Sequence, residues 1–389
     1  MDGPDGEVGF SQDGSRDEHK RQGNIGKSSR HCLFKKAYFE MRHAQMADTK
    51  KEHYVPRCYL ENFASDSKRI EVFDKWKLMV RHNQDIKNVA MENGFYDLDL
   101  LDMLNRIDAE KSETTRRDIM SYMGTNCWDD VVSLLGDKRF VEKEHFANLE
   151  GVYSKLLKVI IQKSYNGNRW VLRNCSAMSK NEKVLFPFFV AIQFLRTPKF
   201  RNTLADMVEG MAQTLAYKSQ MSKENALPKE AFAVDANRDY IKLQHSAMIL
   251  DPEVALHIAE TMVDHIWIMC VNKTNIPFFT SDDPLIRIPH KQDEFRSYSG
   301  FASDKIEIAF PISSSLLLCM YDKKTYGHLF NDRQFYVMQD IEEVNYYNMY
   351  QVINSYRCVF ATEDHFATAK KYCEDHPELQ AYHSTVEVL

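Results

Sequence analysis

The sequence predicts an α+β protein in which an N-terminal hairpin and C-terminal strands form a mixed sheet beside a large helical section. Three observations lead to this fold class. Apolar and polar residues alternate just after residue 68, helical periodicity fills residues 100 to about 267, and short apolar runs follow Trp267. Strands at both ends of a chain around a helical middle are typical of one α+β domain, which we place at residues 49–389.

Residues 1–48 differ in composition from the rest of the chain. They are rich in glycine, serine and charged residues and offer little apolar surface to bury. We therefore expect a disordered N-terminal tail. A second start codon would encode Met46, so the segment is either a tail or an upstream extension of the reading frame.

The first folded stretch is "HYVPRCYLENF" at residues 53–63. Leu60 and Phe63 are three residues apart, which places them on one face of a helix. We expect a short helix or turn that packs on the late sheet and buries Tyr59, Leu60 and Phe63. The next stretch, "RIEVFDKWKLMVRH" at residues 69–82, alternates like two short strands joined by a turn.

Two helix starts are well marked in the middle of the chain. "SKNE" at residues 179–182 is a capping box, and its helix should end before Pro198. Asp251 followed by Pro252 predicts a second helix, with aspartate as the cap and proline at the first helical position.

The sequence after Trp267 has the pattern of β-strands. The runs "WIMCVN", "PFFTS", "LIRI", "KIEIAFPI" and "LLLCMY" are short and apolar. A helix "EEVNYYNMYQVINSY", a strand "CVFA" and a helix "EDHFATAKKYC" follow. These strands should complete the sheet that the early hairpin begins.

The bulk composition narrows the class of protein. The chain has 389 residues, 44% of them hydrophobic, and a net charge of −6, which argues against coating nucleic acid by charge alone but leaves room for a local basic groove. Its eight cysteines form no CxxC pair, so we expect free thiols in a reducing, cytoplasmic compartment. No apolar run approaches the roughly 18 residues of a membrane span, so no membrane partner is expected.

Several polar residues interrupt apolar runs, and each needs a partner or a function. Asp282, after Ser281 in "PFFTSDDPLIRI", fits either a tight turn or a carboxylate held at a strand end for catalysis. Arg196 and Gln193 share a helical face, where the arginine fits either a structural ion pair or a bound phosphate or carboxylate. His53 alone is a weak signal, because most histidines pack without catalysing anything.

Asn345 and Asn348 share a face of the late aromatic helix, where they would cap strand ends or line a polar pocket. No zinc-protease, P-loop, dinucleotide or hydrolase-elbow motif occurs, and the sequence indicates neither a metal site nor a particular cofactor.

The ordered set "HYVPRCYLENF", "FLRTP", "FFTSDDPL", "FPISSS" and "VNYYN" resembles the family catalogued as domain of unknown function 4238. The resemblance covers roughly residues 50 to 362, and the ordered set is specific although its first and fourth members are weak singly. It implies that certain polar residues from distant segments belong together, but it supplies no chemistry. These residues are His53, Arg196, Ser281, Asp282, Asn345 and Asn348.

Two hypotheses follow, and the sequence leaves open whether the protein is an enzyme. The first is a hydrolase of a phosphate ester such as nucleic acid or a nucleotide. Asp282 would be its general base or a metal ligand, His53 its acid or base, and Arg196 the holder of the anion. Ser281, Asn345, Asn348 and Gln193 would contribute to binding. The second is a non-catalytic binding or scaffold module in which the same residues form a buried structural network. We also expect Asp282 and Arg196 to pair, directly or through one shared group.

Overall fold

The computed structural model describes residues 52–97, 125–135, 146–165, 176–220, 233–291 and 297–383, apart from a few single positions elsewhere. The expected tail at residues 1–48 and part of the expected helical section, including residues 98–112, lie outside the described residues.

The strands form two larger sheets and one small one. A five-stranded sheet has the order β10 (Gln334–Met338), β5 (Ile266–Asn272), β9 (Leu316–Tyr321), β8 (Ile306–Ser313) and β7 (Ile286–Pro289). A four-stranded sheet has the order β3 (Met79–Asp85), β2 (Arg69–Asp74), β11 (Cys358–Ala361) and β6 (Thr280–Ser281). β1 (Glu52–His53) pairs with β4 (Met91–Glu92). Only β10 and β5 run parallel among these pairs, so the five-stranded sheet is mixed.

The α+β class is confirmed, but the late strands do not all join the early hairpin. β2 and β3 pair only with β11 and, through it, β6, while the remaining late strands form the other sheet. The chain passes from one sheet to the other at the turn after Ser281. Pro284 in that turn has no N–H for a ladder, which helps to break the strand.

The marked helix starts are confirmed. α8 (Lys180–Leu195) begins with the Ser179–Glu182 capping box, and a new helix, α9 (Pro198–Gln220), begins at the proline that ends it. Asp251 caps α11 (Pro252–Val263), with proline in the first turn. The other long helices are α6 (Ala147–Tyr165), α10 (Arg238–Leu250), α13 (Ile341–Asn354) and α14 (Ala367–Asp375), and the shorter ones are α5 (Trp128–Leu135) and α12 (Lys323–Tyr326).

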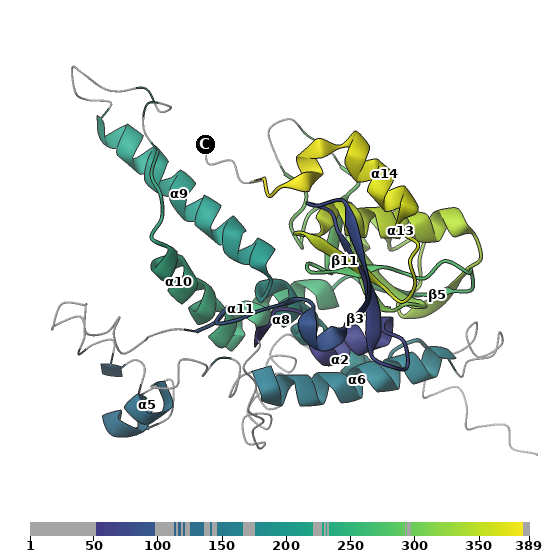
Figure 1. Cartoon of the computed structure of the whole chain (residues 1–389). Coiled ribbons are helices and arrows are strands. Elements are labelled where there is room, and N and C mark those ends of the chain that lie inside the picture. Colours follow the sequence, from purple (N-terminus) through teal and green to yellow (C-terminus); the bar gives the residue numbers. More distant parts are fainter. Residues whose placement is uncertain are drawn as a thin grey trace, which may run out of the picture.

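Both faces of the five-stranded sheet are covered, and β5 shows how. Trp267 and its alternate neighbours pack into the large core with α6, α8 and α11, where the Trp267 and Phe186 rings lie 6.4 Å apart. Ile268 and Cys270 face the other way, into a cluster with Val344 of α13. α14 covers the four-stranded sheet in the same manner, and Figure 1 shows it beside β11. Successive side chains of β5 point to opposite faces of the sheet and therefore pack against helices on both sides.

Residues 53–63 form the predicted short helix. α2 (Arg57–Leu60) continues into a 3₁₀ turn (Glu61–Phe63), and the side chains of Tyr59, Leu60 and Phe63 are completely buried. The Tyr59 hydroxyl donates to the carbonyl of Pro311 at 2.7 Å, which fixes the helix to β8.

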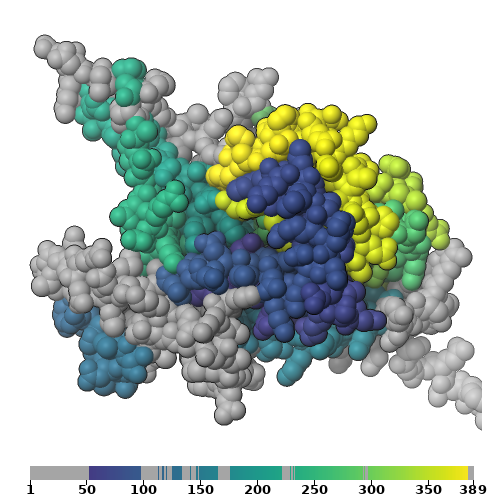
Figure 2. Space-filling model, in the orientation of Figure 1, coloured from purple at the N-terminus to yellow at the C-terminus, as the bar shows by residue number. Residues whose placement is uncertain are grey.

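The outline is irregular. α9 and α10 extend away from the body, and the β2–β3 hairpin lies against the C-terminal segments in the space-filling view (Figures 1 and 2). Among the described helices, none has both the length and the apolar composition needed to cross a membrane.

Candidate functional site

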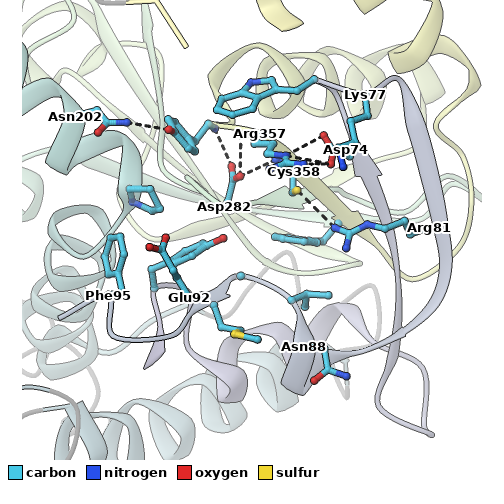
Figure 3. Close-up of a pocket in the computed structure, with 18 of the residues that line it drawn as sticks. Asp74, Lys77, Arg81, Asn88, Glu92, Phe95, Asn202, Asp282, Arg357 and Cys358 are labelled. Atoms are coloured by element: carbon cyan, nitrogen blue, oxygen red, sulfur yellow. Dashed lines mark hydrogen bonds and ion pairs between the residues drawn. The ribbon is translucent and has the colours of Figure 1, made fainter. Parts of the chain in front are cut away.

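A pocket of about 570 Å³ opens between the β2–β3 hairpin, the residues after β4, the start of α9 and the start of β11 (Figure 3). Asp282 lies at its inner wall. Glu92, Phe95 and Asn202 lie on one side of Asp282 in this view, and Lys77 and Arg81 lie on the other. We call the part around Glu92 the acidic end and the part around Lys77 and Arg81 the basic end, although Asp74 lies beside Lys77, and Arg201 and Arg238 also line the pocket.

Asp282 ties the end of β6 to the start of β11. Its Oδ1 accepts the backbone N–H of Tyr356 at 2.8 Å, and its Oδ2 accepts those of Arg357 at 2.8 Å and Cys358 at 2.6 Å. The Asp282 backbone N–H in turn donates to the Cys358 carbonyl. Burial raises the pKa of Asp282 to about 6, against the opposing effects of these N–H donors and of Lys75. The carboxyl is thus both a structural clasp and a proton acceptor in the neutral range.

Two of the arginines in the wall are committed to protein partners. Arg357 forms a forked ion pair with buried Asp74, with Nη2 at 2.7 Å from Oδ2. Arg201 donates to the Phe95 carbonyl at 2.8 Å and stacks on the Phe95 ring at 3.5 Å. A ligand would have to displace existing contacts to use either guanidinium.

Arg81 is different. Its Nη2 makes one weak contact, to the Cys358 sulfur at 3.8 Å, and its buried Nε has no hydrogen-bond partner among the described residues. Burial raises the pKa of Cys358 to about 12, so this thiol is not an anion that could neutralise Arg81. Lys77 lines the same end of the pocket and is exposed. The basic end therefore holds a guanidinium without an acidic partner in the described part of the chain.

Aromatic rings form much of the remaining wall. Trp76 and Tyr356 meet edge to face with ring centroids 5.1 Å apart, and Asn202 donates to the Tyr356 hydroxyl at 2.9 Å. The buried indole Nε1 of Trp76 has no hydrogen-bond partner among the described residues. Aromatic rings and a guanidinium in one pocket suit a ligand that combines a ring with an anion.

A model of the family described as "Protein of unknown function (DUF4238)" matches residues 51–365. The chain belongs to this family. The match covers every residue that lines the pocket. No curated protein and no solved structure matches the chain. The DUF4238 assignment therefore confirms the resemblance seen in the motifs and supplies no activity.

The six polar motif residues fall into separate groups, and of these six only Asp282 lines the pocket. Arg196 closes α8, pairs with Glu150 at 2.9 Å and donates to the backbone carbonyl of His53. Gln193, one turn earlier, donates to the Tyr54 carbonyl at 3.3 Å. These buried side chains hold β1 on the helices, behind the pocket wall that Tyr54 forms.

The other motif residues hold the sheet junction. Ser281 donates to the side chain of Gln351 at 2.7 Å. Asn348 accepts from the Phe279 backbone N–H and donates to the Pro277 carbonyl. Asn345 is only partly buried, and its side chain makes no hydrogen bond with the described residues.

The expected pairing of Asp282 with Arg196 is wrong. All hydrogen bonds of the Asp282 carboxylate go to backbone N–H groups at the start of β11, whereas Arg196 pairs with Glu150. The reason is that backbone donors satisfy a buried carboxylate as well as a counter-ion does. Neither residue therefore needs the other.

The sequence analysis did not single out Arg81 as a candidate site residue. Arg81 and Trp76 both lie in the hairpin that the sequence predicts as two short strands joined by a turn. A tryptophan in a polar hairpin turn was the available signal, because an indole seldom stays in a turn without something to cover it. No group of three or more metal-binding side chains with suitable geometry occurs among the described residues.

Proposed function

We propose that the pocket binds a phosphate ester, either a nucleotide or part of a nucleic acid strand. The observation that carries the proposal is Arg81 at the basic end of the pocket, a guanidinium whose buried Nε has no hydrogen-bond partner among the described residues. A guanidinium presents a fork of N–H donors that matches the oxygens of a phosphate. Lys77 beside it adds a second positive charge.

The rest of the pocket supports a ligand with a ring. Its volume of about 570 Å³ lies within the range of roughly 300–1,000 Å³ typical of small-molecule sites. Trp76 and Tyr356 contribute aromatic rings to the same pocket, and the Arg357 guanidinium lies over the Trp76 ring at 5.2 Å. Glu92 at the acidic end would accept hydrogen bonds from the amino groups of a base. The net charge of −6 fits this picture, because recognition would be local.

Binding can be tested with purified protein by calorimetry. The ligands are the four ribonucleoside monophosphates, the dinucleotide ApA, and adenosine as a control without phosphate. We expect Arg81→Ala to weaken nucleotide binding by at least about tenfold, because a charge-assisted hydrogen bond contributes roughly 1.5–3 kcal/mol. Arg69→Ala, in the same hairpin but outside the pocket, should bind like the parent. Equal affinity for adenosine and its monophosphate, or an unchanged Kd in Arg81→Ala, would contradict the proposal.

Hydrolysis of the bound ester is a second candidate function, favoured by the position and pKa of Asp282. Three of roughly four lone-pair sites on its carboxylate accept backbone N–H groups, which leaves one on the Oδ1 side for a water. Asp282 would take a proton from that water as its oxygen attacks phosphorus and the ester oxygen leaves. In this scheme Arg81 takes the anion-holding role that the sequence suggested for Arg196.

The pH profile tests the hydrolytic step. Because the base must be ionised, turnover should rise as the pH increases through about 6, the pKa of Asp282. Phosphate or nucleoside release from mononucleotides and ApA is the measurement, with and without Mg²⁺. No release under any of these conditions would leave a binding module whose buried polar residues, such as Arg196 and Ser281, are structural.

We infer a cytoplasmic location for this activity. The support is that the six described cysteines are all free thiols, including Cys270 and Cys319, whose sulfur atoms lie only 3.7 Å apart. In an oxidising compartment such a close pair would be at risk of forming a disulfide.

A further inference from the structure

The carboxyl groups of buried Glu52 and partly buried Asp97 lie near each other behind the acidic end of the pocket. Glu52 of β1 is completely buried and pairs in register with Glu92, a residue of the pocket wall. Asp97 directly follows Tyr96, whose backbone N–H donates to Glu52, and the Asp97 carboxyl is near enough to Glu52 to raise its pKa. Glu52 Oε1 and Asp97 Oδ1 are both shielded from solvent, and neither accepts a hydrogen bond from a described donor.

A shared proton would satisfy both oxygens. Two ionised carboxylates that lie close together repel each other, whereas a protonated carboxyl group and a carboxylate form a strong hydrogen bond. Burial, and to a smaller extent the neighbouring Asp97, raises the pKa of Glu52 to about 7, although Glu52 also accepts the Tyr96 backbone N–H. That backbone hydrogen bond measures 2.6 Å at the other oxygen, Oε2.

The nearby positive charges do not replace the proton. The charged and titratable groups around Glu52 are Tyr96 and Asp97 from the segment after β4, Glu92 from β4, Arg201 from α9 and Lys242 from α10. Lys242 donates to the Gly94 carbonyl at 2.7 Å, and Arg201 donates to the Phe95 carbonyl. Both cations thus hold the backbone of residues 94–97, and neither forms an ion pair with Glu52 or Asp97.

Residues 92–97, here called the acidic wall, connect this pair to the pocket. Glu92 and Phe95 line the pocket, while Tyr96 and Asp97 contact Glu52 behind it. Gly94 makes the turn between them with φ of +67°, and a Cβ there would meet the Asp97 carboxylate at 3.0 Å. A side chain at residue 94 would therefore crowd the Asp97 carboxylate, and the glycine lets the two lie close together.

We propose that Glu52 and Asp97 share one proton, and that this proton holds the acidic wall in its closed position against the pocket. The consequence for ligands rests on the proposed function, whereas the shared proton itself does not. When the proton leaves to a base in solution, two carboxylates face each other, and the wall separates from β1. Binding of a nucleotide should then weaken as the pH rises.

Hydrogen exchange at the Tyr96 amide tests the shared proton without any ligand, because this amide donates to Glu52. In the parent protein its protection factor should fall about tenfold between about pH 6 and about pH 8, as expected for one proton with a pKa near 7. In Glu52→Gln the protection should be independent of pH, because the carboxamide donates to Asp97 in place of the proton. Glu61→Gln, an exposed glutamate that pairs with Lys68, should behave like the parent.

Asp97→Asn supplies the donor from the other side and serves if Glu52→Gln does not fold. Protection that stays constant with pH in the parent, or that still falls in the folded carboxamide variant, would overturn the shared proton.

The second arm measures binding of ApA at the same two pH values, because a phosphodiester keeps its charge over this range. The Kd should rise about tenfold in the parent and stay constant in Glu52→Gln. No binding at either pH would defeat the proposed function, and the exchange data would still decide the shared proton. If the Kd for ApA stays constant with pH while the protection of the Tyr96 amide falls, the acidic wall does not control binding in the pocket.

Discussion

At the residue scale, Asp282 shows how one carboxylate can replace a stretch of sheet ladder. It accepts three successive backbone N–H groups at the start of β11, so it fixes the point where the two sheets diverge. This explains why an aspartate stands between apolar strands without an ion pair to a described residue, although Lys75 is near enough to lower its pKa. The same burial that makes the clasp tight raises its pKa into the neutral range.

Asp282→Asn should destabilise the fold. The amide nitrogen would replace one oxygen and face an N–H donor, leaving buried donors unsatisfied at a cost of roughly 2–4 kcal/mol. The urea midpoint for unfolding should fall clearly, while Asp66→Asn, at an exposed position in the turn before β2, should leave it unchanged. Equal midpoints for both variants would mean that the clasp contributes little.

His290 provides a pH-dependent contribution to stability. Its Nε2 lies 2.7 Å from Glu307, which raises the pKa of His290 above its usual value. A raised folded-state pKa gives stability that is complete below the ordinary histidine pKa and is lost as the pH rises through the folded value. The unfolding midpoint of the parent should therefore drop relative to His290→Gln between about pH 6 and about pH 8. A constant difference between the two proteins would contradict this linkage.

At the scale of elements, α2 and its 3₁₀ turn fasten the N-terminal segment to the sheets. Tyr59, Leu60 and Phe63 are completely buried, and Ser314 donates its backbone N–H to the Asn62 carbonyl. Phe63→Ala should cost roughly 3–5 kcal/mol. Tyr59→Phe removes only the hydroxyl contacts with Pro311 and Thr280 and should cost roughly 1–3 kcal/mol. Similar unfolding midpoints for Phe63→Ala and the parent would show that the segment is not part of the core.

Elements whose signals are local could be predicted from the sequence. The capping box at Ser179, the Asp251–Pro252 start and the alternation in β2 depend on neighbours a few residues away. The division of late strands between two sheets could not be predicted, because strand pairing is decided by contacts between distant segments.

The candidate site was predictable only in part for the same reason. Asp282 stood out as a charge among apolar residues, and it does line the pocket. Arg81 looked like an ordinary polar residue of a hairpin strand. Arg81 is a candidate because it has no acidic partner among the described residues. Whether an arginine finds such a partner depends on which distant segments fold around it.

At the scale of the whole molecule, the two sheets and their helical layers leave the pocket around Asp282 where several segments converge. The hairpin, β4, α9 and β11 each contribute to its wall. The family match spans all of these segments and begins near the first of them, at residue 51.

Removal of residues 1–45 should leave the fold and its melting temperature unchanged. The prediction rests on composition alone, because this part of the sequence has little apolar surface to bury. Thermal unfolding of the full chain and the truncated chain is the measurement. A drop of several degrees after truncation would show that the segment docks on the body.

The central claim is that Arg81 holds a phosphate group in this pocket. A crystal structure of the protein with ApA bound tests it most directly, because it locates the ligand. We expect the phosphate within hydrogen-bonding distance of the Arg81 guanidinium and a base against Trp76 or Tyr356. A dinucleotide bound elsewhere, or an empty pocket at saturating ApA, would contradict it.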